Sequence, residues 1–124
     1  MANGMNKCIG VGYVGSDPEL RFTPAGKAVC NFSLGITEGK KDEKVTDWWA
    51  IVAWEDLAVT CDKYIKKGDL VLVEGRLKSN RYTSKLDGVE RTKANIVIYK
   101  MQILHSKNQQ NVKEVREDEY GLPY

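Results

Sequence analysis

The stretch VTDWWAIVAWEDLAVTCDKYIKKGDLVLVEGRL, residues 45–77, changes its hydrophobic period twice. Residues 45–54 end in seven consecutive apolar or aromatic side chains, which is typical of a strand. Residues 55–67 repeat their apolar side chains at helical spacing, and residues 69–77 return to a short apolar run. The order strand, helix, strand is therefore expected at the centre of the fold.

The expected helix carries its own start and stop signals. Leu57, Cys61 and either Tyr64 or Ile65 recur at helical spacing, acids stand at the beginning, and two lysines stand at the end. We expect Gly68 to form the C-terminal cap. This is the one stretch of the chain with a clear helical pattern, so an all-β protein with a single helix is predicted.

Three further segments extend this centre in both directions. Residues 4–14 interleave glycines with apolar side chains, which suits a strongly curved strand, and residues 27–36 alternate with Ala28 and Phe32 on the expected buried face. Residues 80–104 predict a hairpin around Asp87-Gly88. Five strands with one helix between the third and the fourth are typical of the OB-fold, a partly open barrel. We expect this domain to span residues 1–105 and a short flexible tail to span residues 106–124.

Bulk properties place the chain among single-domain soluble proteins. It has 124 residues, a net charge of +2 and no apolar run long enough to span a bilayer. The N-terminus lacks the pattern of a secretory signal, and three widely spaced cysteines do not describe a disulfide framework. We therefore expect a cytoplasmic protein.

All three tryptophans of the chain lie in one predicted strand. Because side chains alternate across a strand, Trp48 and Trp54 share one face with Val52, and Trp49 lies on the other. Both faces are apolar, which allows two interpretations. Either the strand is buried on both sides, or one face is an exposed platform on which nucleic-acid bases stack.

Basic and aromatic side chains elsewhere favour the second interpretation. RFTP places Arg21 beside Phe22, and RLKSNRYTSK interleaves four basic residues with Tyr82. A groove for single-stranded nucleic acid combines cationic and aromatic side chains in this way. The candidate nucleic-acid-binding residues are Trp48, Trp54, Tyr82, Phe22, Arg21, Lys7, Lys27, Lys78 and Arg81.

Four stretches make the chain resemble one family. They are MNKCIGVGYVGSDPELRFTPAGKAVCNFSLGI, TDWWAIVAWEDLAV, YIKKGDLVLVEGRL and NRYTSKLDG, and together they resemble single-stranded DNA-binding proteins of bacteria, phages and plasmids over nearly all of residues 5–105. The resemblance implies base stacking by Trp48, Trp54 and Tyr82, core and subunit packing by Trp49, and a homotetramer. It also implies protection of single-stranded DNA, without sequence preference, during replication, recombination and repair, in association with the nucleoid.

The resemblance extends to the last eight residues, EDEYGLPY, although the preceding linker is short. In the family, an acidic tip followed by Leu or Ile, Pro and an aromatic residue recruits replication and repair proteins. The residues implied in partner binding are Glu117, Asp118, Glu119, Leu122, Pro123 and Tyr124. The charged loop TEGKKDEK lacks an aromatic residue that the family often has there, so the length of wrapped DNA stays open.

Other functions have weaker support in the sequence. The single histidine, His105, lies at the end of the last expected strand, where a structural or solvated role is expected, and GVGYVG matches a nucleotide-binding glycine motif only in part, so no enzyme is expected. The cysteines lack the paired spacing of a zinc site, and neither a metal nor another cofactor is expected. The alternative is a specialised OB-fold module, either a primosome component or an RNA-binding protein, since stacking alone does not separate DNA from RNA.

Overall fold

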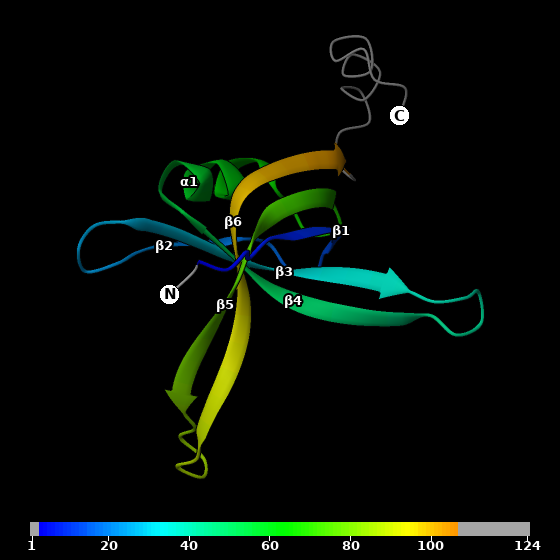
Figure 1. The fold of residues 1–124 in the computed structure, drawn as a ribbon. Coiled ribbons are helices and arrows are strands. Elements are labelled where there is room, and N and C mark those ends of the chain that lie inside the picture. Colours follow the sequence, from blue (N-terminus) through cyan, green and yellow to red (C-terminus); the bar gives the residue numbers. More distant parts are fainter. Residues whose placement is uncertain (1–2, 107–124) are drawn as a thin grey trace.

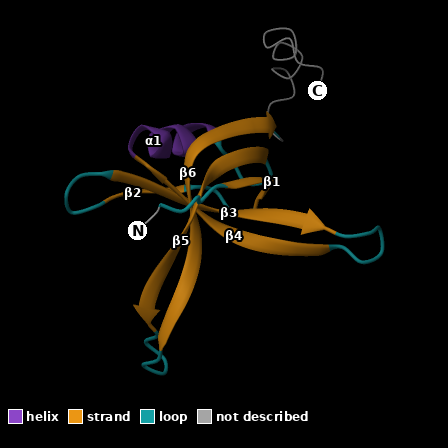
Figure 2. Cartoon of the chain, in the orientation of Figure 1, coloured by secondary structure: helices purple, strands orange, loops and turns teal. Residues whose placement is uncertain are grey.

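The computed structural model describes residues 3–106, which form six strands and one helix (Figures 1 and 2). Three longer strands and one short strand come before the helix, and two long strands follow it. In chain order the elements are β1 (Cys8–Val14), β2 (Glu19–Phe22), β3 (Ala28–Glu38), β4 (Val45–Trp54), α1 (Glu55–Tyr64), β5 (Leu70–Thr83) and β6 (Glu90–His105).

The strands close into the expected barrel. Their order in the sheet is β1-β5-β6-β4-β3-β2, and an additional pairing of β1 with β3 joins the two sides. β4 and β6 run parallel through residues 50–53 and 95–98, whereas the other pairs are antiparallel. The all-β OB-fold with one helix before the last two strands is confirmed. The short β2, which the sequence indicates only as an extended piece, pairs with β3 and adds a sixth strand.

One side of each strand supplies the core. In β3 the side chains of Cys30, Phe32 and Leu34 are buried, which confirms the alternation expected for this strand. α1 adds Ala58 and Cys61 to the same cluster. The barrel interior is therefore filled by side chains, and function has to be sought on its outer surface.

The end of α1 differs from the expectation. The helix ends at Tyr64, and its C-cap is Ile65, whose N–H donates to the carbonyl of Cys61 at 2.9 Å. Gly68 is not the cap: it lies in the following turn with φ +93°, where its N–H donates to Val14. Ile65 already has an extended backbone, with φ −85° and ψ 136°, and the N–H of Lys66 donates to Asp69 Oδ2 at 2.9 Å in place of a helical hydrogen bond.

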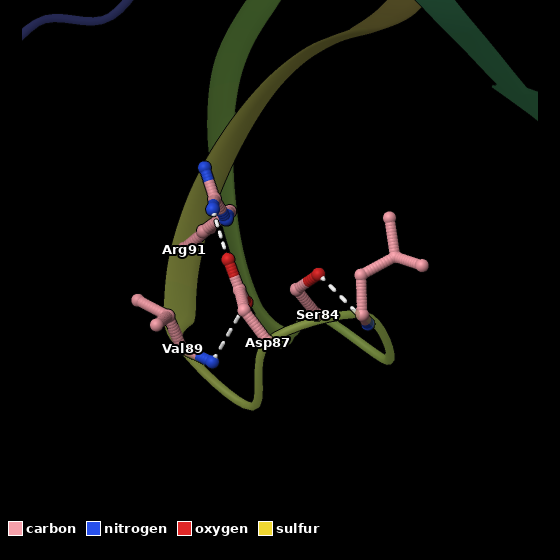
Figure 3. Close-up of polar contacts among 5 residues, drawn as sticks. Ser84, Asp87, Val89 and Arg91 are labelled. Carbon is pink, nitrogen blue, oxygen red and sulfur yellow. Dashed lines mark hydrogen bonds and ion pairs between the residues drawn. The ribbon is translucent and has the colours of Figure 1, made fainter.

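Two hairpins, β3–β4 and β5–β6, extend from the barrel in different directions (Figure 1). The turn of the β5–β6 hairpin contains Asp87 and Gly88 as expected, with Gly88 at φ +69°. The Asp87 carboxylate accepts hydrogen bonds from the N–H of Val89 at 3.0 Å and from Arg91 at 2.5 Å (Figure 3). The hydrogen bond from Val89 contributes most to lowering the pKa of Asp87, and the bond from Arg91 adds to it. Together the two bonds fix the turn.

Candidate nucleic-acid interface

The tryptophan strand β4 has one inward and one outward side. Trp49 packs against the core together with the buried Ile51 and Ala53. On the other side, Trp48 is 60% exposed and Trp54 is 41% exposed. Among the described residues, β4 is therefore not buried on both sides. Two large aromatic rings face outward, and the rise of roughly 3.4 Å per residue from Trp48 to Trp54 puts them about 20 Å apart.

Strand pairing extends this outward side over neighbouring strands. In β3, Gly35 lies opposite Trp48 and Val29 lies opposite Trp54. Arg21 of β2 in turn lies opposite Val29, which brings a guanidinium group to the Trp54 end. Residues directly opposite each other in antiparallel strands point to the same face. Arg21 thus belongs to the same outward surface as both tryptophans.

Residues of β5 extend this surface beyond β6, the strand that lies between β4 and β5. Ala50 and Val52 of β4 lie beside Asn95 and Val97 of β6, whose partners in β5 are Lys78 and Arg76 respectively. Both basic residues are exposed. Alternation along β5 then places Tyr82, 48% exposed, on the same side. We call the surface made by Arg21, Trp48, Trp54, Arg76, Lys78 and Tyr82 the tryptophan face.

Phe22 and Lys27 lie beside the tryptophan face, but neither residue occupies one of its strand positions. Phe22 lies opposite Ala28, on the other side of β2 from Arg21, and is 65% exposed because the strand ends there. Lys27 is exposed in the turn that follows, where its backbone N–H donates to Thr23 Oγ1 at 3.1 Å. Their proximity to the Trp54 end keeps both residues as candidates for contact with a nucleic acid.

Lys7 and Arg81 each form an ion pair with a carboxylate. The Lys7 ammonium lies 2.9 Å from Glu74 Oε1, and this hydrogen bond raises the pKa of Lys7 and lowers that of Glu74. Arg81 projects from the opposite side of β5 from Lys78 and lies 3.8 Å from Glu90. The positive charge of each is thus offset by a carboxylate.

Arg76 belongs to the tryptophan face, but it is not among the candidate residues predicted from the sequence. Its position follows from counting back in twos from Tyr82 through Lys78, a signal that is available in the sequence once the strand is known to be continuous. The bulge between Glu74 and Gly75 interrupts the pairing just before it.

The corner after Trp54 has an uncommon backbone conformation. Trp54 is the N-cap of α1 and makes no side-chain capping bond, and the next residue, Glu55, has φ +58°. This left-handed conformation costs a residue other than glycine roughly 1–2 kcal/mol. The turn that ends β4 is thus held in place by the packing of the strand and the helix on either side.

The residues implied in partner binding, 117–124, lie outside the described residues, so their structure is not part of this site. Over residues 3–106, no helix is long and apolar enough to cross a membrane.

Comparisons with known proteins agree with this geometry. The model of the single-strand binding protein family matches residues 5–104, and the chain belongs to this family. A single-stranded DNA-binding protein of Neisseria meningitidis serogroup A is 41% identical over 123 residues, which cover 94% of this chain and 70% of the relative. The single-stranded DNA-binding protein 1 of Chlorobaculum tepidum is 41% identical over 113 residues, covering 87% of this chain and 70% of the relative.

A solved structure extends the likeness to three dimensions. It is described as a Plasmodium falciparum SSB complex with ssDNA, and it superposes with a TM-score of 0.74 at 25% sequence identity. The superposition covers 86% of this chain and 99% of the other. The expected family and the expected fold are therefore both confirmed.

Proposed function

We propose that the protein binds single-stranded DNA without sequence preference through the tryptophan face. The observation that carries this proposal is the outward exposure of Trp48 and Trp54 beside Arg21, Arg76 and Lys78. Every base has a π-face, so stacking accepts any sequence, and each stacked base contributes about 1–3 kcal/mol. The relatives of 41% identity are single-stranded DNA-binding proteins, which supports DNA as the ligand.

Each part of the face has a separate task. Trp48 and Trp54 are too far apart to contact one base, so they stack on different bases of a strand that crosses β4. Arg76 and Lys78 lie two strands away from the tryptophans, where their charges attract the phosphates between stacked bases. Binding is therefore a sum of salt-independent stacking and salt-dependent phosphate contacts.

The cellular role follows the same proposal. Coating exposed single strands protects them during replication, recombination and repair, and it needs no catalytic group and no cofactor. We assign residues 1–105 to the DNA-binding domain and residues 106–124 to a tail whose acidic tip recruits replication and repair proteins in the cytoplasm, at the nucleoid. The acids and the Leu122-Pro123-Tyr124 segment suit a pocket that joins basic and apolar side chains.

We infer that the active form is a homotetramer. Ile9, Val11 and Tyr13 alternate along β1 and are all exposed, although β1 is a central strand of the barrel wall. Leu72, partly exposed, lies opposite Val11 and continues the same outward apolar surface. A contiguous apolar surface of this kind usually marks an interface between subunits.

The experiment that tests the binding proposal is a titration of the full chain with unlabelled oligodeoxythymidine, followed by tryptophan emission. Stacking on Trp48 and Trp54 quenches the emission, and raising the salt concentration weakens binding as phosphate contacts are lost. Duplex DNA of equal length is the control and binds far more weakly, since its bases are not free to stack. An RNA strand of equal length that binds more tightly than the DNA would instead support the RNA-binding module.

A further inference from the structure

The backbone beneath Trp48 has a feature that stacking alone does not require. Gly35 lies directly opposite Trp48 and occupies an outward position, yet it is buried. A Cβ atom at residue 35 would lie 2.7 Å from Cζ3, 2.8 Å from Cη2 and 3.0 Å from Cε3 of Trp48. The six-membered ring of the indole therefore rests on the backbone of Gly35, in space that any other residue would fill.

A second glycine reaches the same ring from a different element. Gly15 follows β1, and its N–H donates to the carbonyl of Ser33 at 2.9 Å. A Cβ atom at residue 15 would overlap Cζ3 of Trp48, lie 3.0 Å from Cη2, and lie 2.8 Å from Ser33 Oγ. Two glycines from separate segments thus converge on the same two ring atoms, Cζ3 and Cη2, of one indole.

Backbone conformation does not explain either glycine. The described glycines with positive φ are Gly26, Gly39, Gly68 and Gly88, so residues 15 and 35 have conformations open to any amino acid. Space is the remaining requirement. Alanine at either position would have to displace the tryptophan ring or the strands themselves, since contacts below 3.0 Å are not tolerated.

We propose that Gly15 and Gly35 are positioning residues that form a glycine seat, which holds the Trp48 indole in the orientation needed for stacking. This inference rests on the proposed binding of single-stranded DNA. A side chain that is 60% exposed ordinarily keeps its rotamer freedom and loses it on binding, which weakens affinity. The seat contacts the six-membered ring at Cε3, Cζ3 and Cη2, while 60% of Trp48 stays exposed, so Trp48 is ordered before DNA arrives.

The first test examines the seat in the absence of DNA. The full chain is labelled with 5-fluorotryptophan, and Trp48→Phe assigns the fluorine resonance of residue 48. Gly35→Ala shifts or broadens this resonance, and Gly15→Ala does the same from the other side of the seat. The matched control is Gly10→Ala, whose Cβ would lie 3.0 Å from Ile36 Cδ1 and has Ile36, Leu34 and Val73 as its nearest neighbours. A resonance of Trp48 that is unchanged in both seat variants overturns the proposal.

The second test links the seat to binding through a double-mutant cycle. Trp48→Ala lowers the affinity for oligodeoxythymidine by roughly five-fold or more, the minimum expected for loss of one stacked base. Gly35→Ala, checked for folding by circular dichroism, lowers it by at least about three-fold but by no more than Trp48→Ala, since it can at most remove the same contact. In the Trp48→Ala background, Gly35→Ala has no further effect, because the seat acts through that ring.

An equal loss from Gly35→Ala in both backgrounds overturns the seat, because the glycine would then act elsewhere. Unchanged affinity in Trp48→Ala contradicts the stacking role in the proposed function instead, and it does so whatever the fluorine spectra show. The two failures are therefore distinguishable.

Discussion

Trp48 and Trp49 are neighbours in the chain, and the structure predicts opposite consequences for their removal. Trp49 packs on the core, so Trp49→Ala lowers the free energy of unfolding by about 3 kcal/mol, the lower end for large aromatic side chains. Trp48 leaves 60% of its surface exposed, and Trp48→Ala lowers that free energy by about 1 kcal/mol. The order reverses for DNA. Trp48→Ala weakens binding by about 1–3 kcal/mol, and Trp49→Ala leaves the affinity of the folded protein within about two-fold.

Both quantities can be measured on the same samples. Urea unfolding followed by far-ultraviolet circular dichroism gives the stability, with all variants at one protein concentration because an oligomer stabilises its subunits by mass action. Anisotropy of a labelled oligodeoxythymidine gives the affinity under conditions where each variant is folded. Equal losses of affinity in the two variants would refute the assignment of one tryptophan to the outer face and the other to the core.

Three further outcomes follow from ion pairs, buried thiols and surface charge. The hydrogen bond from Lys7 holds the pKa of Glu74 below its usual value. The ion pair therefore stabilises the protein above the unfolded-state pKa of Glu74, and this stabilisation is lost as pH falls through the folded-state pKa. Thermal melts should show a smaller drop in melting temperature on acidification for Glu74→Gln than for the parent protein. Burial raises the pKa of Cys30 to about 11 and of Cys61 to about 12, so both thiols should resist iodoacetamide at pH 8 until urea unfolds the chain, as peptide mass mapping can check. Lys78→Ala should reduce the slope of log affinity against log salt by about 1, and an unchanged slope would remove this lysine from the phosphate path.

The strand order and the buried faces are the parts of the fold that the sequence predicts well. Alternation of apolar side chains identifies the inner face of β3, and the change to helical spacing identifies α1. The end of α1 is less predictable, because glycine commonly follows a helix and Gly68 is the first glycine after this one. The N–H groups of Lys66 and Lys67 instead donate to Asp69 and Asp17, and the bond to Asp17 joins residues that are distant in the chain.

The functional surface is predictable only in part for a related reason. The parity of β4 separates Trp48 and Trp54 from Trp49, but it does not say which face is exposed, since both are apolar. The partners of a basic residue depend on strand register: Lys7 meets Glu74 from β5, a contact between residues distant in the chain. The seat under Trp48 depends on the β3–β4 register in the same way.

The most direct test of the central claim is photocrosslinking of the full chain to a single strand that carries 5-iodouracil, followed by mass spectrometry of the crosslinked peptides. Halogenated uracil couples to the aromatic ring on which it stacks, so the position of the crosslink reports the stacking residue. The tryptophan face predicts crosslinks at Trp48 and Trp54, with Tyr82 as a third position. Crosslinks confined to the exposed side of β1, at Tyr13, with none at Trp48 or Trp54, would contradict the account.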